Sequence, residues 1–326
     1  MEELELEQNE QLLEQRRLRR LEQKRRRKTQ QRMVLGLLAL IVVLALVLIV
    51  RGCRAKPAPA PVEPSTPSEP VDTAAPTEPE ADSVVQLTAV GDIMIYDDIL
   101  AAAQTAEGVY DFSDCFSAVA AYTMAADLTV GNLELNFCGA PYAGKPDFRA
   151  PEALAGTLRD IGFDVLQTAN TYSIQNGMTG LSGTISALDA VGIDHVGTYA
   201  TQAERDASGG VLVKTVNGVR IAFIAFTKGV NNLTLPEGSE FAVDLLYTDY
   251  DSDYSKVAQD AIVQTAKNAA ATDADIVIAM LHWGSEYDNT ITDTQKKIES
   301  LLLENGVDVI LGSHSHVVGN LTEKTV

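Results

Sequence analysis

Short apolar runs alternate with segments of helical periodicity over the C-terminal part of the chain. The runs are rich in Val, Ile and Leu and end in small or polar residues, as buried strands do. The segments between them repeat apolar residues every three or four positions, which predicts amphipathic helices. This alternation predicts an α/β domain over residues 84–326. The predicted strands are Val84–Val90, Leu128–Val130, Val165–Thr168, Ile193–Val196, Val211–Thr215, Arg220–Phe226, Asp275–Leu281 and Val307–Leu311. The predicted helices are Asp111–Ala126, Pro151–Ile161, Gly180–Val191, Tyr254–Thr272 and Asp293–Asn305.

One connection differs from the others because it is too short for a helix. Asn217 and Gly218 lie between two apolar runs, and this dipeptide favours a two-residue hairpin turn. A hairpin joins antiparallel strands, so at least one sheet of the domain is expected to be mixed.

The N-terminal part of the chain has a different pattern. Residues 33–50 are 18 consecutive apolar or glycine residues without a charge. At about 1.5 Å per residue, a helix of this length spans about 27 Å, close to the hydrocarbon core of a bilayer. We therefore predict one transmembrane helix over residues 33–50.

The alternatives to an uncleaved anchor fit less well. A cleaved signal peptide has a shorter apolar region and a small-residue cleavage site, and neither is present. A lipoprotein site at Cys53 has Gly52 before it, but Arg51 stands where a small or apolar residue is expected. Ten basic residues precede the span, so the positive-inside rule predicts a cytoplasmic segment over residues 1–32 and a body outside the cell.

A proline-rich segment separates the predicted span from the body. Residues 57–83 contain eight prolines among Ala, Glu, Ser and Thr. This composition is typical of an extended, solvated polyproline segment. We predict that residues 51–83 form an extracellular linker that holds the body away from the membrane.

Charge and cysteine content narrow the functional classes. Residues 57–326 carry 12 Lys and Arg against 38 Asp and Glu. Such an acidic body repels phosphate backbones, which argues against a nucleic-acid partner and makes divalent cations plausible ones. The three cysteines cannot form a disulfide scaffold, and Cys115 and Cys138 are either one bridge or two buried thiols.

Polar clusters follow five of the predicted strands. Ligands of α/β sheets bind beside the carboxyl ends of the strands, so clusters spread over more than 220 residues are expected to converge. Three of the four histidines of the chain lie in these clusters. The clusters are Gly91-Asp92, Gly131-Asn132-Leu133-Glu134, Ala169-Asn170-Thr171-Tyr172, His282-Trp283-Gly284-Ser285-Glu286 and Gly312-Ser313-His314-Ser315-His316.

The residue types in these clusters favour a metal site. Imidazole nitrogens together with carboxylate oxygens suit Zn, Mn or Fe ions. His314 and His316 are two residues apart, so an extended backbone would direct both rings to one side. Each signal is weak alone, but their joint occurrence predicts a metal or catalytic site.

The same motifs give the chain a family resemblance over residues 84–320. It resembles the CapA family of poly-γ-glutamate capsule biosynthesis proteins, which are similar to calcineurin-like metallophosphatases. The motifs that carry the resemblance are Val90-Gly91-Asp92-Ile93-Met94, Gly131-Asn132-Leu133-Glu134, Ala169-Asn170, His282-Trp283-Gly284 with Glu286, and Gly312-Ser313-His314-Ser315-His316-Val317.

The resemblance implies a metallophosphatase-like, layered α/β sandwich with mixed sheets and a divalent metal centre. A bound metal of this kind polarises a substrate oxygen and lowers the pKa of a bound water. The metal ligands that it implies are Asp92, Glu134, His282, His314 and His316. The catalytic residues that it implies are His282, Glu286 and Asn170.

The third motif departs from the family pattern. Where the family has Ala-Asn-Asn-His and then an aspartate three residues later, this chain has Tyr172 and Gln175. A tyrosine transfers protons poorly near neutral pH because its usual pKa is about 10. Family members also continue beyond the His-x-His motif, so we expect the chain to be truncated at its C-terminus.

Three functions remain open from the sequence. The first is a membrane-anchored, metal-dependent hydrolase-like enzyme that acts on an anionic capsule polymer such as poly-γ-glutamate, or on a phosphoester. The second is a non-catalytic component that binds the polymer or the capsule synthase, with contacts through bridging cations or a basic patch near Lys145 and Arg149. The third is an envelope binding module unrelated to capsule. Lys228 is a candidate substrate contact at the edge of the cleft.

Overall fold

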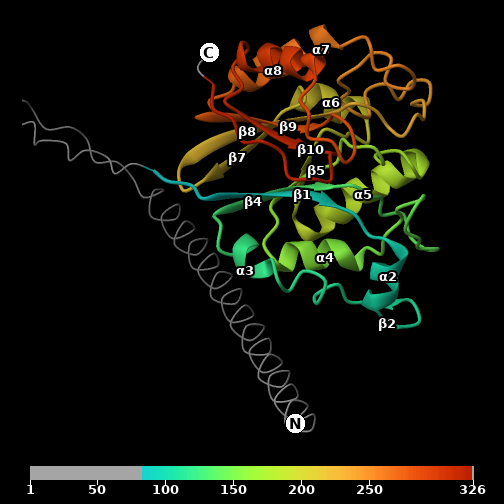
Figure 1. Ribbon diagram of the computed structural model, residues 1–326. Helices are drawn as coiled ribbons and strands as arrows, with labels where there is room; N and C mark the ends of the chain where they lie inside the picture. The colour runs from blue at the N-terminus through green and yellow to red at the C-terminus, as the bar shows by residue number, and fades with distance from the viewer. Residues whose placement is uncertain (1–82, 325–326) are drawn as a thin grey trace, which may run out of the picture. The chain divides into compact units, whose positions relative to one another are not determined.

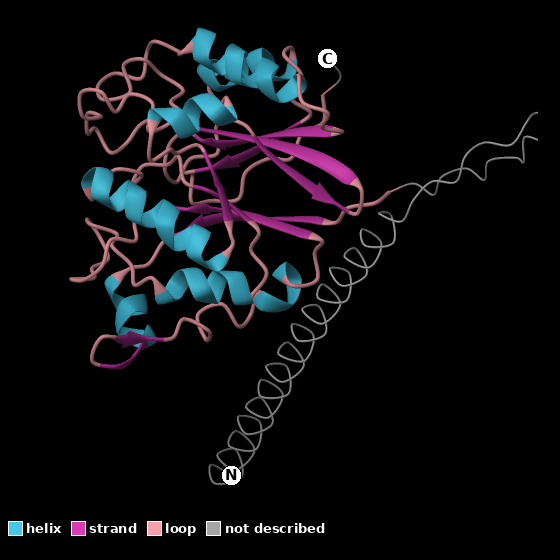
Figure 2. Ribbon diagram, turned by 180° about the vertical axis from the view of Figure 1, so that it is seen from behind, coloured by secondary structure: helices cyan, strands magenta, loops and turns pink. Residues whose placement is uncertain are grey.

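The computed structural model describes residues 83–324, which form two four-stranded sheets packed face to face with helices on both outer surfaces (Figure 1). Figure 2 shows the same four layers from behind. The layered α/β architecture is therefore confirmed. The predicted N-terminal segment, span and linker up to residue 82 lie outside the described residues. Within residues 83–324, no helix combines the length and the apolar character needed to cross a bilayer.

The first sheet has the strand order β1-β4-β5-β6, and all its strands are parallel. Helices α2, α4 and α5 cover its outer face through buried residues such as Leu100, Leu158 and Leu188. Its strands are β1 (Leu87–Ile93), β4 (Leu128–Leu133), β5 (Val165–Gln167) and β6 (Asp194–Val196). Its helices are α2 (Asp97–Ala103), α3 (Ala120–Thr123), α4 (Ala153–Asp160) and α5 (Gly177–Val191).

The second sheet has the order β10-β9-β8-β7 and is mixed, because β7 pairs with β8 in the antiparallel direction. The predicted hairpin at Asn217-Gly218 makes this connection. Ile262 of α7 and Ile298 of α8 pack on its outer face. Its strands are β7 (Leu212–Val216), β8 (Val219–Thr227), β9 (Ile276–His282) and β10 (Val309–Ser313). Helix α6 (Gln202–Ser208) precedes β7, α7 (Gln259–Ala270) follows β8, and α8 (Asp293–Leu303) follows β9.

The inner faces of the two sheets form a separate apolar core. Val130 and Val165 of the first sheet meet Phe223 and Met280 of the second. Strands that are buried on both faces appear in a sequence as continuous apolar runs, so these strands could be predicted from their composition. Packing the sheets in this way brings the edge strands β1 and β10 together.

The predicted helix over residues 111–126 is wrong for most of its length. Only Ala120–Thr123 is helical, and the preceding residues form turns. The side chain of Asp111 accepts hydrogen bonds from the backbone N–H and the hydroxyl of Ser113, and this local pairing competes with a helix. The small hairpin of β2 (Gln104–Ala106) and β3 (Val109–Tyr110) was also not predicted.

Two other helix boundaries depend on side-chain capping. Helix α6 was not predicted from the sequence, although Thr201 and Glu204 form a complete capping box at its start. Helix α7 begins at Gln259, five residues later than predicted, because the carboxylate of Asp249 accepts the backbone N–H groups of Ser255 and Lys256. Cys115 and Cys138 are both free thiols, so of the two alternatives the disulfide is not present. They are not two buried thiols either, because Cys115 is exposed and Cys138 is partly exposed.

Candidate metal centre

Polar side chains from both sheets converge where β1 and β4 end beside β9 and β10. Asp92 lies near the end of β1 and Glu134 follows β4, while His282 ends β9 and His314 follows β10. Asp92 accepts a hydrogen bond from the backbone N–H of His314, 222 residues away in the chain. The expected convergence of the strand ends therefore occurs, and it combines the two sheets.

Asp92 connects the two halves of this cluster. Its Oδ1 accepts a hydrogen bond of 2.7 Å from the Asn132 side chain. Its Oδ2 accepts the backbone N–H of His314 at 3.1 Å and lies 2.9 Å from Nδ1 of His316. The β1–β4 register is irregular between Ala89 and Asp92, so the aspartate is at a local bulge rather than in a regular ladder.

His282 is fully buried and has polar neighbours at both ring nitrogens. Its Nδ1 lies 3.2 Å from the Asn132 amide and 3.1 Å from the Ser313 hydroxyl. Its Nε2 lies 2.8 Å from the Thr171 hydroxyl and 3.3 Å from Oε1 of Glu134. These neighbours fix the orientation of the ring, as the partners of metal-bound histidines do.

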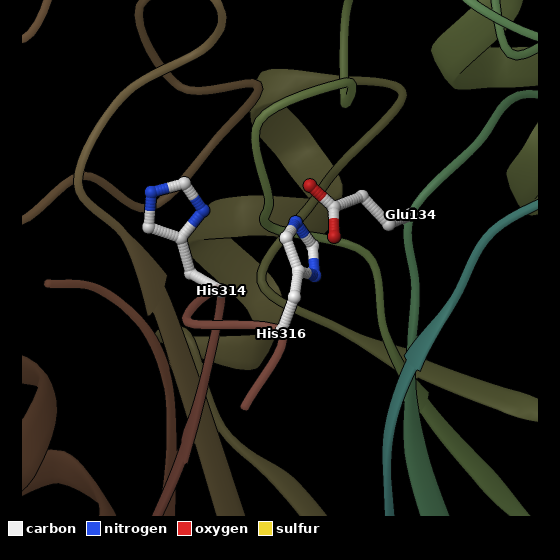
Figure 3. Close-up of side chains that lie close together, drawn as sticks. All are labelled: Glu134, His314 and His316. Atoms are coloured by element: carbon white, nitrogen blue, oxygen red, sulfur yellow. The ribbon is translucent and has the colours of Figure 1, made fainter. Parts of the chain in front are cut away.

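His314 and His316 reach the cluster in a way that the sequence did not indicate. Strand β10 ends at Ser313, and the φ angles of His314 and His316 are 90° and 52°, so this stretch is not extended. The centroids of the two rings still lie 6.1 Å apart. Each ring offers a nitrogen within 4.8 Å of a carboxylate oxygen of Glu134 (Figure 3). Left-handed backbone at non-glycine residues is unfavourable and is concentrated at functional sites.

The protonation state of His314 suits a metal ligand. Burial, followed by the nearby charges of His282, Lys228 and His316, lowers the pKa of His314 to about 3. The imidazole is therefore neutral at physiological pH, and neutral imidazole is the form that ligates metals.

Two groups of potential ligands share one carboxylate. Glu134, His314 and His316 offer ligand atoms within 4.8 Å of one another, and Asp92, Glu134 and His282 do the same. Two buried atoms here, Oε2 of Glu134 and Nδ1 of His314, have no hydrogen-bond partner. A buried polar atom without a partner is costly, and a divalent cation would satisfy both atoms. The residues present therefore fit a metal ion.

The predicted catalytic residues Asn170 and Glu286 belong to neither ligand group. Asn170 is fully buried, and its side-chain N–H groups are donated to Asn132 and to the backbone carbonyl of Leu133. Its side-chain oxygen accepts the backbone N–H of Tyr172. Asn170 thus holds Asn132 and the end of β4 in place, whereas Glu286 is exposed outside the cluster.

Tyr172 follows Asn170 by two residues and packs into the apolar core outside the first sheet. Its ring packs 4.4 Å from that of Phe148, measured between centroids, and only 8% of the residue is exposed. Burial, together with the nearby charges of Glu134 and Glu286, raises the pKa of Tyr172 to about 12. The phenol therefore keeps its proton near neutral pH. Gln175, the second departure from the family pattern, accepts a hydrogen bond from the Asn231 side chain.

Three residues that contact His282 were not predicted as site residues: Asn132, Thr171 and Ser313. All three lie inside the polar clusters that mark the strand ends. Their residue types are common in loops, so nothing in the sequence indicated which of them point toward the histidine. The clusters predicted where the site lies, but the individual contacts depend on the backbone.

Comparison with known proteins gives a consistent result. Residues 86–323 match the model of the family described as bacterial capsule synthesis protein PGA_cap. The chain is 27% identical over 244 residues to the PGA biosynthesis protein CapA of Bacillus subtilis, which covers 73% of this chain and 59% of that protein. It is 28% identical over 172 residues to the capsule biosynthesis protein CapA of Bacillus anthracis, which covers 52% of this chain and 38% of that protein. The chain therefore spans less than two thirds of the length of either relative.

Proposed function

Because the chain belongs to the bacterial capsule synthesis protein family PGA_cap, we propose that its body is a metal-dependent, hydrolase-like component of capsule polymer biosynthesis or processing. The substrate in this proposal is an anionic capsule polymer such as poly-γ-glutamate. The observation that carries the proposal is the pair of ligand groups that share Glu134 and contain two buried atoms without partners.

The chemistry of the donor set supports this function. Asp92, Glu134, His282, His314 and His316 would hold the ion, with Mn, Zn or Fe as the candidates. A bound divalent ion supplies a Lewis acid for a substrate oxygen and lowers the pKa of bound water. Thr171 and Asn132 keep the His282 ring in one orientation. Glu286, which the family resemblance implies as catalytic, is an exposed carboxylate four residues after His282 and is the candidate proton acceptor of this proposal.

A second candidate function is a non-catalytic component that binds the capsule polymer or a synthase subunit. Tyr172 favours it, because the position at which the family resemblance implies a histidine holds a buried phenol. A phenol with a pKa of about 12 is a poor proton donor or acceptor near pH 7. The metal would then have a binding role instead of a catalytic one.

The cellular placement is also part of the proposal. The uncharged apolar stretch at residues 33–50 and the ten basic residues before it support a single-pass anchor with a cytoplasmic N-terminus. The proline-rich segment over residues 51–83 would then hold the acidic body outside the cell.

The experiment that tests the proposal uses the purified full chain in detergent with Mn²⁺ or Zn²⁺. Metal binding is measured by calorimetry, and the length of poly-γ-glutamate is followed by size-exclusion chromatography, with a nitrophenyl phosphodiester as a second substrate. We expect metal binding by the wild type and metal-dependent cleavage of one of these substrates. The His314→Ala/His316→Ala variant should show neither.

Each outcome selects one function. Metal binding with polymer binding but no cleavage would favour the non-catalytic component. Absence of metal binding by a folded wild type, checked by circular dichroism, would refute a metal-dependent centre. Metal binding without any interaction with the polymer or the phosphodiester would favour an envelope binding module unrelated to capsule.

A further inference from the structure

The body is strongly acidic, so a polyanion that binds to it needs either a bridging cation or a lysine or arginine that is not already paired. Five of the twelve lysines and arginines in residues 83–324 already have an acidic partner. Arg159, Arg205, Lys214, Lys296 and Lys324 form ion pairs with Asp or Glu.

The basic patch suggested by the sequence near Lys145 and Arg149 is weaker than it looked. The Arg149 guanidinium donates to three backbone carbonyls, those of Cys138, Gly139 and Ala140. These bonds fix the loop that follows Phe137, and they leave Lys145 as the exposed cation of that patch.

Lys228 differs from these cations in its position. It directly follows β8, and its backbone N–H donates to the carbonyl of His282 at 2.9 Å. Its Nζ donates to the carbonyl of Gly284 at 2.8 Å, two residues beyond His282. The ammonium group is thus at the same carboxyl edge of the second sheet as the candidate metal centre.

The ammonium group of Lys228 is held in place without being neutralised. Its Nζ lies 5.0 Å from the centre of the Tyr254 ring, a cation–π distance. Within the described part of the chain, no carboxylate forms an ion pair with it. A lysine ammonium has three donors, and one of them goes to Gly284, so two remain for a ligand.

The electrostatic surroundings agree with this geometry. Partial burial lowers the pKa of Lys228, and the charge of Glu286 opposes that shift. The backbone of Lys228 contacts the candidate ligand His282, and its Nζ contacts Gly284 two residues later, so Lys228 lies beside the centre.

We propose that Lys228 is a substrate-binding residue that holds an anionic oxygen, a carboxylate or a phosphate, next to the metal centre. The proposal rests on the proposed function and deepens it, because it names the group that the site recognises. A fixed cation beside the metal selects substrates that carry a negative charge near the bond that is processed. The tethering of Nζ by Gly284 and Tyr254 lowers the entropy that Lys228 would lose on binding.

The test compares Lys228→Met with Lys297→Met in the full chain. Lys297 is an exposed lysine of α8, so its removal changes the net charge equally away from the centre. Binding of a γ-linked glutamate hexamer and of inorganic phosphate is measured by calorimetry with and without Mn²⁺. Hydrogen bonds to charged groups are strong, so we expect Lys228→Met to weaken anion binding about tenfold or more. We expect Lys297→Met to leave it unchanged.

Mn²⁺ affinity and thermal melting show that each variant remains folded with an intact centre. A loss of affinity for the hexamer alone, or for phosphate alone, supports the proposal and identifies the anion. Unchanged binding of both anions, or no anion binding by the wild type, overturns it. If the wild type binds no Mn²⁺ but Lys228→Met still weakens anion binding, the proposed metal function fails while the role of Lys228 stands.

Discussion

Two buried charged clusters in this protein differ in whether their polar atoms are satisfied. In the first, Oδ1 of Asp244 accepts Nε–H of Arg205 at 2.9 Å and Oδ2 accepts the Tyr199 hydroxyl at 2.7 Å. Nη2 of Arg205 also donates to Thr265 of α7 at 3.2 Å. In the second, the candidate metal centre, Oε2 of Glu134 and Nδ1 of His314 have no partner.

The difference indicates what each cluster does. A buried cluster whose donors and acceptors are matched joins parts of the fold, and here it ties α6 to α7 and to the segment that contains Asp244. A buried cluster with unmatched acceptors at the carboxyl ends of strands is suited to a cation. We therefore assign stability to the Asp244 cluster and ligand binding to the Glu134 cluster, and the following experiments test this division.

The largest expected effect is on metal binding. His314→Ala/His316→Ala removes two of the three residues in one ligand group. Replacing a residue that only hydrogen-bonds to a metal ligand already lowers metal affinity about 10–100-fold, so Mn²⁺ affinity should fall here by more than about a hundredfold. Calorimetry measures this affinity. Arg205→Met is the control, because it alters the other cluster and should bind Mn²⁺ as the wild type does. A double-histidine variant with wild-type affinity would contradict the division.

The second expected effect is on stability. Arg205→Met leaves the buried carboxylate of Asp244 without its cation. Because removing one partner of a buried ion pair is strongly destabilising, the free energy of unfolding should fall by about 3 kcal/mol. Urea unfolding of metal-free protein measures this loss. Arg159→Met removes a more exposed ion pair with Asp164 and should cost less than about 1 kcal/mol. Equal losses in both variants would show that the Asp244 cluster has no special role in stability.

The third expectation concerns the pH dependence of that loss. Burial raises the pKa of Asp244 to about 6, and the Arg205 guanidinium limits this rise. Because this pKa is higher in the folded state than in the unfolded state, protonation of Asp244 stabilises the folded protein. The full contribution to the free energy of unfolding is present below about pH 4, and it is lost as the pH rises through the folded-state pKa. Without Arg205 the folded-state pKa is higher still, so the variant continues to lose stability above pH 6.

The stability gap between the wild type and Arg205→Met should therefore be small near pH 4 and widen toward about pH 8. Unfolding curves in the presence of a chelator over this range measure the gap. A gap that is constant with pH would mean that the guanidinium acts through packing and not through its charge.

The smallest expected effect sharpens the description of the metal centre. Thr171→Val removes the hydroxyl that lies 2.8 Å from Nε2 of His282 and keeps nearly the same shape. Metal affinity should fall about tenfold, the lower end of the range for residues that orient a ligand. Thr168→Val also removes a buried hydroxyl, one that pairs with Thr198 away from His282, and should leave metal affinity unchanged. Identical affinities in the two variants would remove Thr171 from the site.

Most of the scaffold could be predicted from the sequence because burial dictates composition. Strands such as β8 and β9 are buried on both faces, and their apolar runs were recognised directly. The helix predicted over residues 111–126 was wrong because the turn made by Asp111 is a local hydrogen-bonding choice that periodicity does not report.

The sequence by itself determined which polar residues follow the strands, and the family resemblance implied that Asp92, Glu134, His282, His314 and His316 are the candidate ligands among them. Only the tertiary structure decided how they meet. The packing of the two sheets brings β1 against β10, and the left-handed backbone at His314 and His316 turns both rings toward Glu134. The direction of a side chain depends on local dihedral angles and on neighbours distant in the chain, and a linear pattern of residue types contains neither.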